Sequence, residues 1–423
     1  MNRIFLVPWL VIALIGCTNN LQVEQSDYTT ATAEINVITP TARESGWAVY
    51  DPDPDHLWNR VFRQFFRRTT KDGKEYGSDE LDPLLWFDTT YLLNGNSHQQ
   101  ALLVLDEFLT TNAENLVRDP LKRAMFQRDM WAVFDWLSFQ PDPYPLQREA
   151  LQSGLAQVIK RIALTREEIL SLPDSYQLAV ESNAFPPNFQ EEQPQDAFLP
   201  SDLFQENSAW VPMGREGGPI AMAHTEGFPF LGRSVFLVFV RSPDGRTATL
   251  DFIHSLNTER RPVLATGSGV ALVRRMLLID DQGNLVLSPL VETVQIRHFN
   301  LQRIFHEFEL DRARLLKGYA DAFRLKTGLI MLFFSHGDVF EISDLPTPYA
   351  AIPDICRACH VNVPAVYDRG NIQGILSYSR ANFPLPDNQQ PILRATSWED
   401  EAQTVIQWKL NHVTWQSFEA LWH

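Results

Sequence analysis

The chain of 423 residues is predicted to be an α+β protein. Apolar residues recur at helical spacing up to about residue 184, and the alternation typical of strands begins near residue 233. Because 44% of the residues are hydrophobic, the chain can bury a substantial core. We therefore expect an N-terminal helical domain (46–184), an irregular connection (185–232), an antiparallel β domain like a sandwich or barrel (233–340) and a small C-terminal segment (341–423).

Capping residues mark where the N-terminal helices should begin. Asp119 precedes Pro120, which suits the first helical position, and Thr165 with Glu168 forms a capping box. Ser97 can cap another helix. On the first helix, one face should carry Leu57, Val61, Phe62, Phe65 and Phe66.

The connection over 185–232 is rich in Pro, Gln, Gly and acidic residues. Long loops of this kind in compact proteins are often functional. After it, alternating and β-branched residues predict strands over 235–240, 246–253, 270–280, 285–287, 294–299, 304–310 and 325–334. Near the end of the chain, Ser397 with Asp400 three positions later predicts a C-terminal helix.

The first sixteen residues have the pattern of an export signal. Arg3 supplies a positive charge, and the apolar stretch 4–15 is too short to span a bilayer. The sequence 14–17, Leu-Ile-Gly-Cys, resembles the bacterial lipobox. That resemblance implies cleavage after residue 16, lipidation of Cys17, and an extracytoplasmic protein anchored to a bacterial membrane, facing the periplasm or the cell surface. The segment that follows is rich in Thr, Asn, Gln and Ser, which predicts a flexible tether over 17–45. The alternative is an ordinary secretory signal with an incidental cysteine.

Five residues near the other end carry the chemistry. Residues 356–360 read Cys-Arg-Ala-Cys-His, and the chain has only three cysteines. C-x-x-C-H is the attachment signature of a c-type haem. Cys356 and Cys359 would form thioethers with the porphyrin, and His360 would be the proximal ligand of the iron.

The motif has two other interpretations. A zinc site would need a fourth ligand, and adjacent Cys359 and His360 rarely bind one metal well. A dithiol or disulfide of Cys356 and Cys359 would be expected at a helix start after a strand, a context that the sequence matches only in part.

With its leader and motif together, the chain resembles a monohaem c-type cytochrome carried on a bacterial lipoprotein. The resemblance implies electron transfer through one covalent haem, and no catalytic residue is assigned. A motif close to the C-terminus is also similar to cytochromes c′, which implies the alternative of a five-coordinate haem enzyme or a sensor for peroxide or nitric oxide. A third alternative is a non-haem surface binding protein with a Cys356–Cys359 disulfide.

The sixth iron ligand is left open by the sequence. No methionine follows Cys359, so a methionine ligand must come from upstream. An open sixth position is also compatible with the sequence. The candidate ligands are Met213, Met222, His224, His336 and His412.

The charge of the chain restricts its partners. The formal net charge is −16 and the isoelectric point is near 5.1. An acidic surface argues against nucleic acid and against an anionic membrane surface as partners. It favours a basic redox partner protein.

Overall fold

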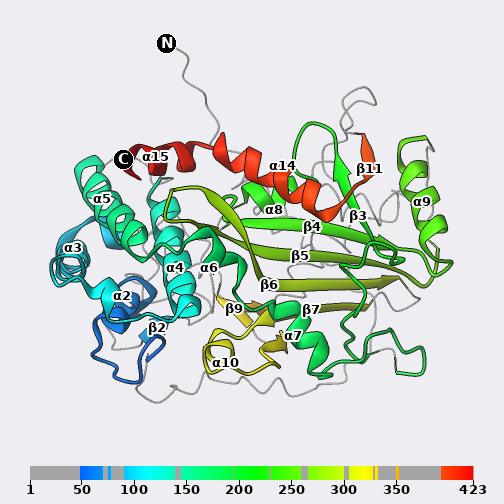
Figure 1. Cartoon of the computed structure of the whole chain (residues 1–423), viewed down its shortest axis with the longest axis horizontal. Coiled ribbons are helices and arrows are strands. Elements are labelled where there is room, and N and C mark those ends of the chain that lie inside the picture. The colour runs from blue at the N-terminus through cyan, green and yellow to red at the C-terminus, as the bar shows by residue number, and fades with distance from the viewer. Residues whose placement is uncertain are drawn as a thin grey trace, which may run out of the picture.

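The computed structural model describes residues 48–69, 75–77, 90–138, 144–193, 195–227, 230–258, 265–299, 304–326, 329–331, 349–351 and 392–422. These residues form an α+β fold built on one seven-stranded antiparallel sheet, in the order β11-β3-β4-β5-β6-β7-β8 (Figure 1). The predicted fold class is therefore confirmed. The strands are β1 (Arg67–Thr69), β2 (Glu75–Gly77), β3 (Val211–Arg215), β4 (Ser234–Arg241), β5 (Ser268–Ile279), β6 (Leu285–Phe299), β7 (Ile304–Leu310), β8 (Phe323–Leu325), β9 (Leu329–Met331), β10 (Tyr349–Ala351) and β11 (Leu393–Ala395).

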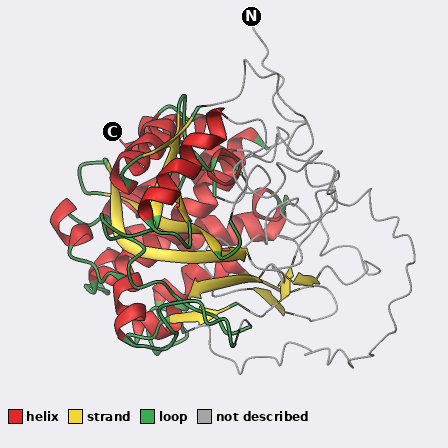
Figure 2. Cartoon of the chain, turned by 90° about the vertical axis from the view of Figure 1, so that its right-hand side faces the viewer, coloured by secondary structure: helices red, strands yellow, loops and turns green. Residues whose placement is uncertain are grey.

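Helices precede, interrupt and follow this sheet. In Figure 1 the N-terminal helices stand at one end of the strands, α9 lies at the other end, and α14 runs along β4. Figure 2 shows the sheet from its end, with the helices gathered beside it. The helices are α2 (Leu57–Phe66), α3 (Gly95–Thr110), α4 (Pro120–Ser138), α5 (Pro145–Ile162), α6 (Arg166–Leu170), α7 (Ser175–Glu181), α8 (Met222–Glu226), α9 (Arg246–Thr258), α10 (Arg312–Leu316), α14 (Trp398–Leu410) and α15 (Val413–Trp422).

Three of the predicted helix starts are confirmed. Asp119 accepts hydrogen bonds from the backbone N–H groups that follow Pro120, and Thr165 forms the capping box with Glu168. Ser397 caps α14. The predicted cap at Ser97 is wrong. Helix α3 begins two residues earlier, and the Ser97 hydroxyl donates to backbone carbonyl groups instead of accepting from the helix.

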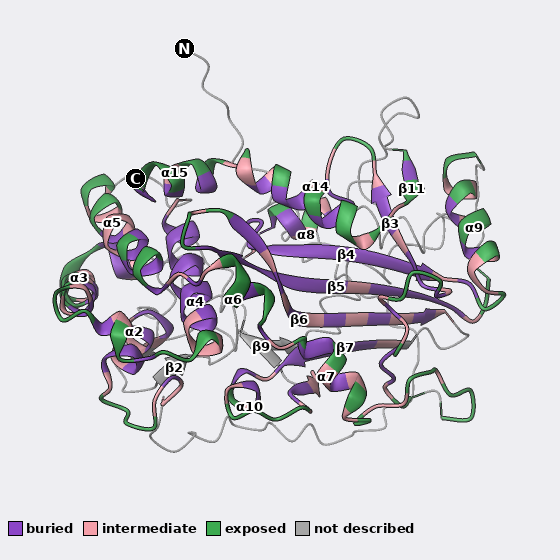
Figure 3. Ribbon diagram, in the orientation of Figure 1, coloured by how far each residue is buried: buried purple, intermediate pink, exposed green. Residues whose placement is uncertain are grey.

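The central strands are buried on both faces (Figure 3). Along β4, Val235, Leu237 and Phe239 join the large core that also contains the N-terminal and C-terminal helices. The alternate residues Phe236, Val238 and Val240 join a smaller core. This alternation follows from the period of two in a strand, and it places hydrophobic layers on both sides of the sheet.

The segment 246–253 was predicted to be a strand, and this prediction is wrong, because it forms the first part of α9. The polar turn after β4 starts a helix, in which Thr249 Oγ1 donates to the carbonyl of Gly245 at 3.0 Å. Thr249 and Ile253 are buried and Leu256 is partly buried, at helical spacing. The partner of β4 is instead β5.

Strands outside the predicted β range complete the sheet. The 185–232 connection contributes β3 and also contains α8, and the C-terminal segment contributes β11 at the sheet edge. Among the described strands, the pairs β1–β2 and β9–β10 lie outside the seven-stranded sheet. A sandwich or barrel is not confirmed, and the division into domains stays a prediction.

Candidate functional site

The residues of the predicted haem motif lie outside the described part of the chain. This applies to Cys356, Cys359 and His360, to the lipidation candidate Cys17 and to the ligand candidate His336. The other four ligand candidates, Met213, Met222, His224 and His412, are described.

Met213 lies one strand in from the edge of the sheet. It belongs to β3, pairs with Val238 of β4 and Ala395 of β11, and is fully buried in the smaller core. A side chain enclosed in this way packs as an ordinary core methionine. Met213 therefore does not fit the role of an iron ligand.

Met222 and His224 lie together on the short helix α8. The backbone after this helix returns to it, since Gly232 N–H donates to the Thr225 carbonyl at 2.8 Å. The His224 ring stacks on Phe236, with 5.4 Å between the ring centroids. Burial lowers the pKa of His224 to about 4, so the imidazole is neutral at pH 7. The neutral imidazole is the form that binds a metal.

His412 lies between α14 and α15, where hydrogen bonds fix its tautomer. Its Nδ1 lies 3.0 Å from Thr414 Oγ1 and 3.4 Å from the Thr414 backbone N–H, which can only donate. Lys409 Nζ donates to the same hydroxyl at 2.6 Å. Nδ1 is thus an acceptor and Nε2 carries the hydrogen. Binding of iron through Nε2 would require this hydrogen to move to Nδ1 and the contact with the Thr414 backbone N–H to change, so His412 fits the role of a ligand less well.

The backbone of Gly232 connects the α8 region to the end of α14. A Cβ at Gly232 would lie 2.6 Å from Cζ3 of Trp408, and this glycine has φ +73°. Both the contact and the backbone conformation require glycine. On its other side, Trp408 stacks on His412 with 4.7 Å between centroids. The structure therefore brings α8 and His412 to neighbouring positions, although more than 180 residues separate them in sequence.

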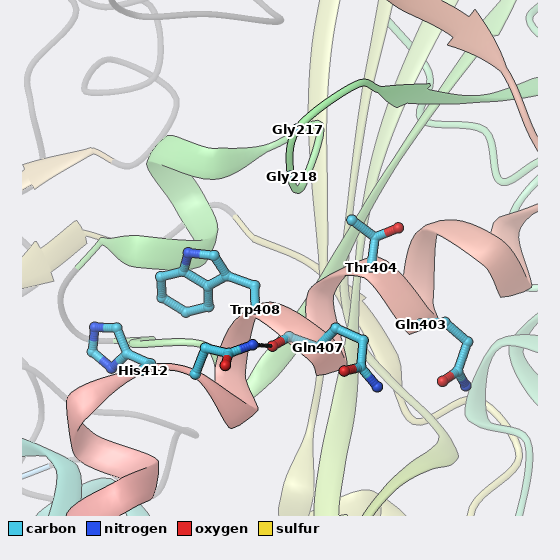
Figure 4. Close-up of a pocket in the computed structure, with 8 residues that line it drawn as sticks. Gly217, Gly218, Gln403, Thr404, Gln407, Trp408 and His412 are labelled. Atoms are coloured by element: carbon cyan, nitrogen blue, oxygen red, sulfur yellow. Dashed lines mark hydrogen bonds between the residues drawn. The ribbon is translucent and has the colours of Figure 1, made fainter.

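An open pocket of about 550 Å³ lies at this place, between the Gly217–Gly218 turn and α14 (Figure 4). Glu401 lies in the first turn of helix α14. Its carboxylate accepts a hydrogen bond from the Ile220 N–H at 2.7 Å, which holds the segment after the two glycines against the helix. Burial raises the pKa of Glu401 to about 7. The residues that line the pocket are Gly217, Gly218, Gln403, Thr404, Gln407, Trp408, Asn411 and His412.

A buried ionic cluster beside this pocket is not predicted by the sequence analysis. Asp135 of α4 pairs with Arg233 at 2.9 Å and with Lys409 at 2.8 Å, and all three side chains are almost fully buried. Burial lowers the pKa of Lys409 to about 8, although Asp135 raises it. The available signal was the presence of charged residues within the apolar run of α4, because buried charges are retained only when they are paired.

No described group of three or more His, Cys, Asp or Glu residues could hold a metal ion. Among the described helices, none combines the length and apolar composition needed to cross a bilayer.

Comparison of the chain with protein-family models, curated proteins and solved structures finds no match.

Proposed function

We propose that this chain is an exported, lipid-anchored protein that carries one covalent haem c and transfers electrons. The observation that carries the proposal is the sequence Cys-Arg-Ala-Cys-His at 356–360. The chain has one other cysteine, Cys17, and it follows a leader with the features of a lipoprotein signal. Haem c is attached outside the cytoplasm, so the two features are consistent with each other.

Each residue of the motif has a defined role in this proposal. Cys356 and Cys359 attach the porphyrin through thioethers, and the His360 imidazole binds the iron. The haem, when bound, supplies one-electron exchange. With its acidic composition, the protein would dock a basic partner.

The described candidates for the sixth ligand differ in how well they fit. Met213 is a core residue, and the hydrogen bonds of His412 place the hydrogen on Nε2. This leaves His224 and Met222, which share α8, as the described candidates that fit best. His336 remains a candidate outside the described residues.

The full-length chain, produced in a bacterium with a working haem c maturation system, tests the proposal. We expect haem staining to survive a denaturing gel, because only a covalently attached haem is retained after boiling. Cys356→Ala and Cys359→Ala should each reduce the staining strongly, with loss in the double variant. His360→Ala should leave stained protein with an altered visible spectrum. A colourless native protein would overturn the proposal.

The spectrum also separates electron transfer from the alternative haem functions. A low-spin spectrum that carbon monoxide does not change supports a six-coordinate electron carrier. A high-spin spectrum that shifts with carbon monoxide would instead favour a five-coordinate haem enzyme or sensor. Absence of haem together with a Cys356–Cys359 disulfide, detected by mass spectrometry, would favour a surface binding protein.

A further inference from the structure

The pocket beside α14 has room because of the Gly217–Gly218 turn. Arg215, at the end of β3, bridges back to Gly218, and the two glycines have φ +80° and +146°. A Cβ at Gly217 would meet nothing within 4 Å, so this side of the turn faces open space. The contact of Glu401 with the Ile220 N–H holds the following segment on α14. The pocket thus has one wall formed by the glycine turn, with the Met222 and Arg215 side chains close to Gly218, and one wall of helix side chains.

The helix wall is uncharged. Its side chains come from successive turns of α14, from Gln403 to His412, and include no Asp, Glu, Lys or Arg. Exposed protein surface is normally rich in charge, and this chain has a net charge of −16. Because burial lowers the pKa of His412 to about 4, the ring is neutral at pH 7. The wall therefore favours neither anions nor cations.

Several polar groups on this wall have hydrogen-bonding capacity left over. Gln403 and Gln407 are exposed, and their side-chain amides make no hydrogen bond to the described residues. Asn411 uses Nδ2 to donate to the Gln407 carbonyl at 2.7 Å, which leaves Oδ1 as an acceptor. Trp408 Nε1 has no acceptor in the described part of the chain. An amide group both donates and accepts, as does a hydroxyl group.

The indole of Trp408 is packed on one face and along its six-membered part. His412 stacks on the ring, and the backbone of Gly232 approaches its six-membered part. The N–H edge is thus the polar part that the ring can offer. Figure 4 shows Thr404 and Trp408 on the side of α14 that faces the glycine turn, with Gln407 between them along the helix.

We propose that this pocket binds a neutral oligosaccharide. A sugar presents several hydroxyl groups at short intervals, each able to donate and accept, and carries no charge. The pocket offers amide groups in a row, an indole N–H and a glycine turn, over a volume suited to a small ligand. This inference does not depend on haem binding.

Saturation-transfer NMR tests the proposal with full-length protein in a detergent that contains no sugar. The probes are maltotriose, triacetylchitotriose and the acidic trigalacturonic acid. Transfer of saturation to either neutral trisaccharide supports the proposal. Transfer to triacetylchitotriose alone would show that the ligand carries acetamido groups, and transfer to maltotriose alone would show that hydroxyl groups suffice.

Variants locate the binding in the pocket. Gln403→Ala with Gln407→Ala should raise the dissociation constant by roughly two- to tenfold for each hydrogen bond lost. Trp408→Phe removes the N–H but keeps an aromatic ring against Gly232, and it should also weaken binding. Gln100→Ala changes an exposed glutamine of α3 and should leave binding unchanged.

Three results would overturn the proposal. These are no transfer to either neutral probe at millimolar concentration, equal transfer in the native protein and in the double glutamine variant, and stronger binding of the acidic trisaccharide than of both neutral ones.

Discussion

Lys409 of α14 donates a hydrogen bond to Asp135 of α4, with 2.8 Å between Nζ and Oδ2. Both side chains are fully buried, and Lys409 also donates to the Leu231 carbonyl and to the Thr414 hydroxyl. These three bonds use all the donors of the ammonium group. These bonds fix the C-terminal helices to α4. Lys409 directly follows Trp408 in α14, and His412 lies three residues further along the chain.

Replacing Lys409 by methionine should destabilise the protein by about 3 to 5 kcal/mol. The substitution leaves Asp135 buried with one cationic partner fewer, and breaking a buried ion pair on one side is strongly unfavourable. Urea unfolding followed by circular dichroism measures the change. Lys317→Met, at an exposed position after α10, is the matched control and should change stability by less than about 0.5 kcal/mol. Equal effects of the two substitutions would contradict a structural role for the pair.

Tyr50→Phe should lower the free energy of unfolding by about 1 to 3 kcal/mol. The hydroxyl of Tyr50 donates to Asp129 and accepts from Arg312, whose guanidinium binds both oxygens of the same carboxylate. Hydrogen bonds to charged groups contribute more than neutral ones. Tyr319→Phe, at a half-exposed position, is the control. The prediction is wrong if the two variants unfold at the same urea concentration.

The free energy of unfolding of the Glu401→Gln variant, minus that of the native protein, should increase as the pH rises from 5 to 8. Burial raises the pKa of Glu401 from 4.5 to about 7, so the folded protein holds a proton that the unfolded chain has lost. Native stability from this group therefore decreases between pH 4.5 and 7. The shift corresponds to a relative gain on the order of 2 to 3 kcal/mol for the glutamine variant.

Urea titrations at pH 5, 6, 7 and 8 measure this difference. Glutamine can still accept from the Ile220 N–H, so the variant keeps that contact. Glu399→Gln, at an exposed position on the same helix, is the control variant. A constant difference between Glu401→Gln and the native protein across the range would contradict the raised pKa.

The choice among iron ligands gives a spectroscopic prediction that depends on the proposed haem. Met213→Leu and His412→Gln should leave the visible spectrum unchanged, because the first residue fills the core and the second carries its hydrogen on Nε2. His224→Leu should convert a low-spin spectrum to a high-spin one if His224 is the sixth ligand. A spectral change in His412→Gln alone would reassign the ligand to His412.

Cys17→Ser should prevent lipidation. The resemblance of residues 14–17 to a lipobox implies that this thiol receives the lipid, and several acyl chains make membrane anchoring effectively permanent. Labelling with radioactive palmitate should mark the native protein and not the variant, which should leave the membrane fraction. Cys356→Ser should keep the label. Labelling of Cys17→Ser would contradict the lipoprotein assignment.

Several local structures could be predicted because neighbouring residues determine them. The caps at Asp119, Thr165 and Ser397 each involve backbone N–H groups within three positions, so the sequence shows both partners. The short run of β-branched and aromatic residues at β4 and the alternation at β6 both favour strands. The segment 246–253 was predicted wrongly as a strand. Its helical burial depends on the packing of α9 against the smaller core, and that packing partner is distant in sequence.

The sequence by itself determined the α+β class, the positions of several helices, and the motif and leader on which the proposed function depends. The tertiary structure alone decided that β3 and β11 complete the sheet, that Lys409 meets Asp135, and that His412 lies beside Trp408 with its hydrogen on Nε2. The physical reason is the range of the interactions. Caps and periodic burial depend on residues a few positions apart, whereas strand partners, buried ion pairs and pocket walls join residues that only folding brings together.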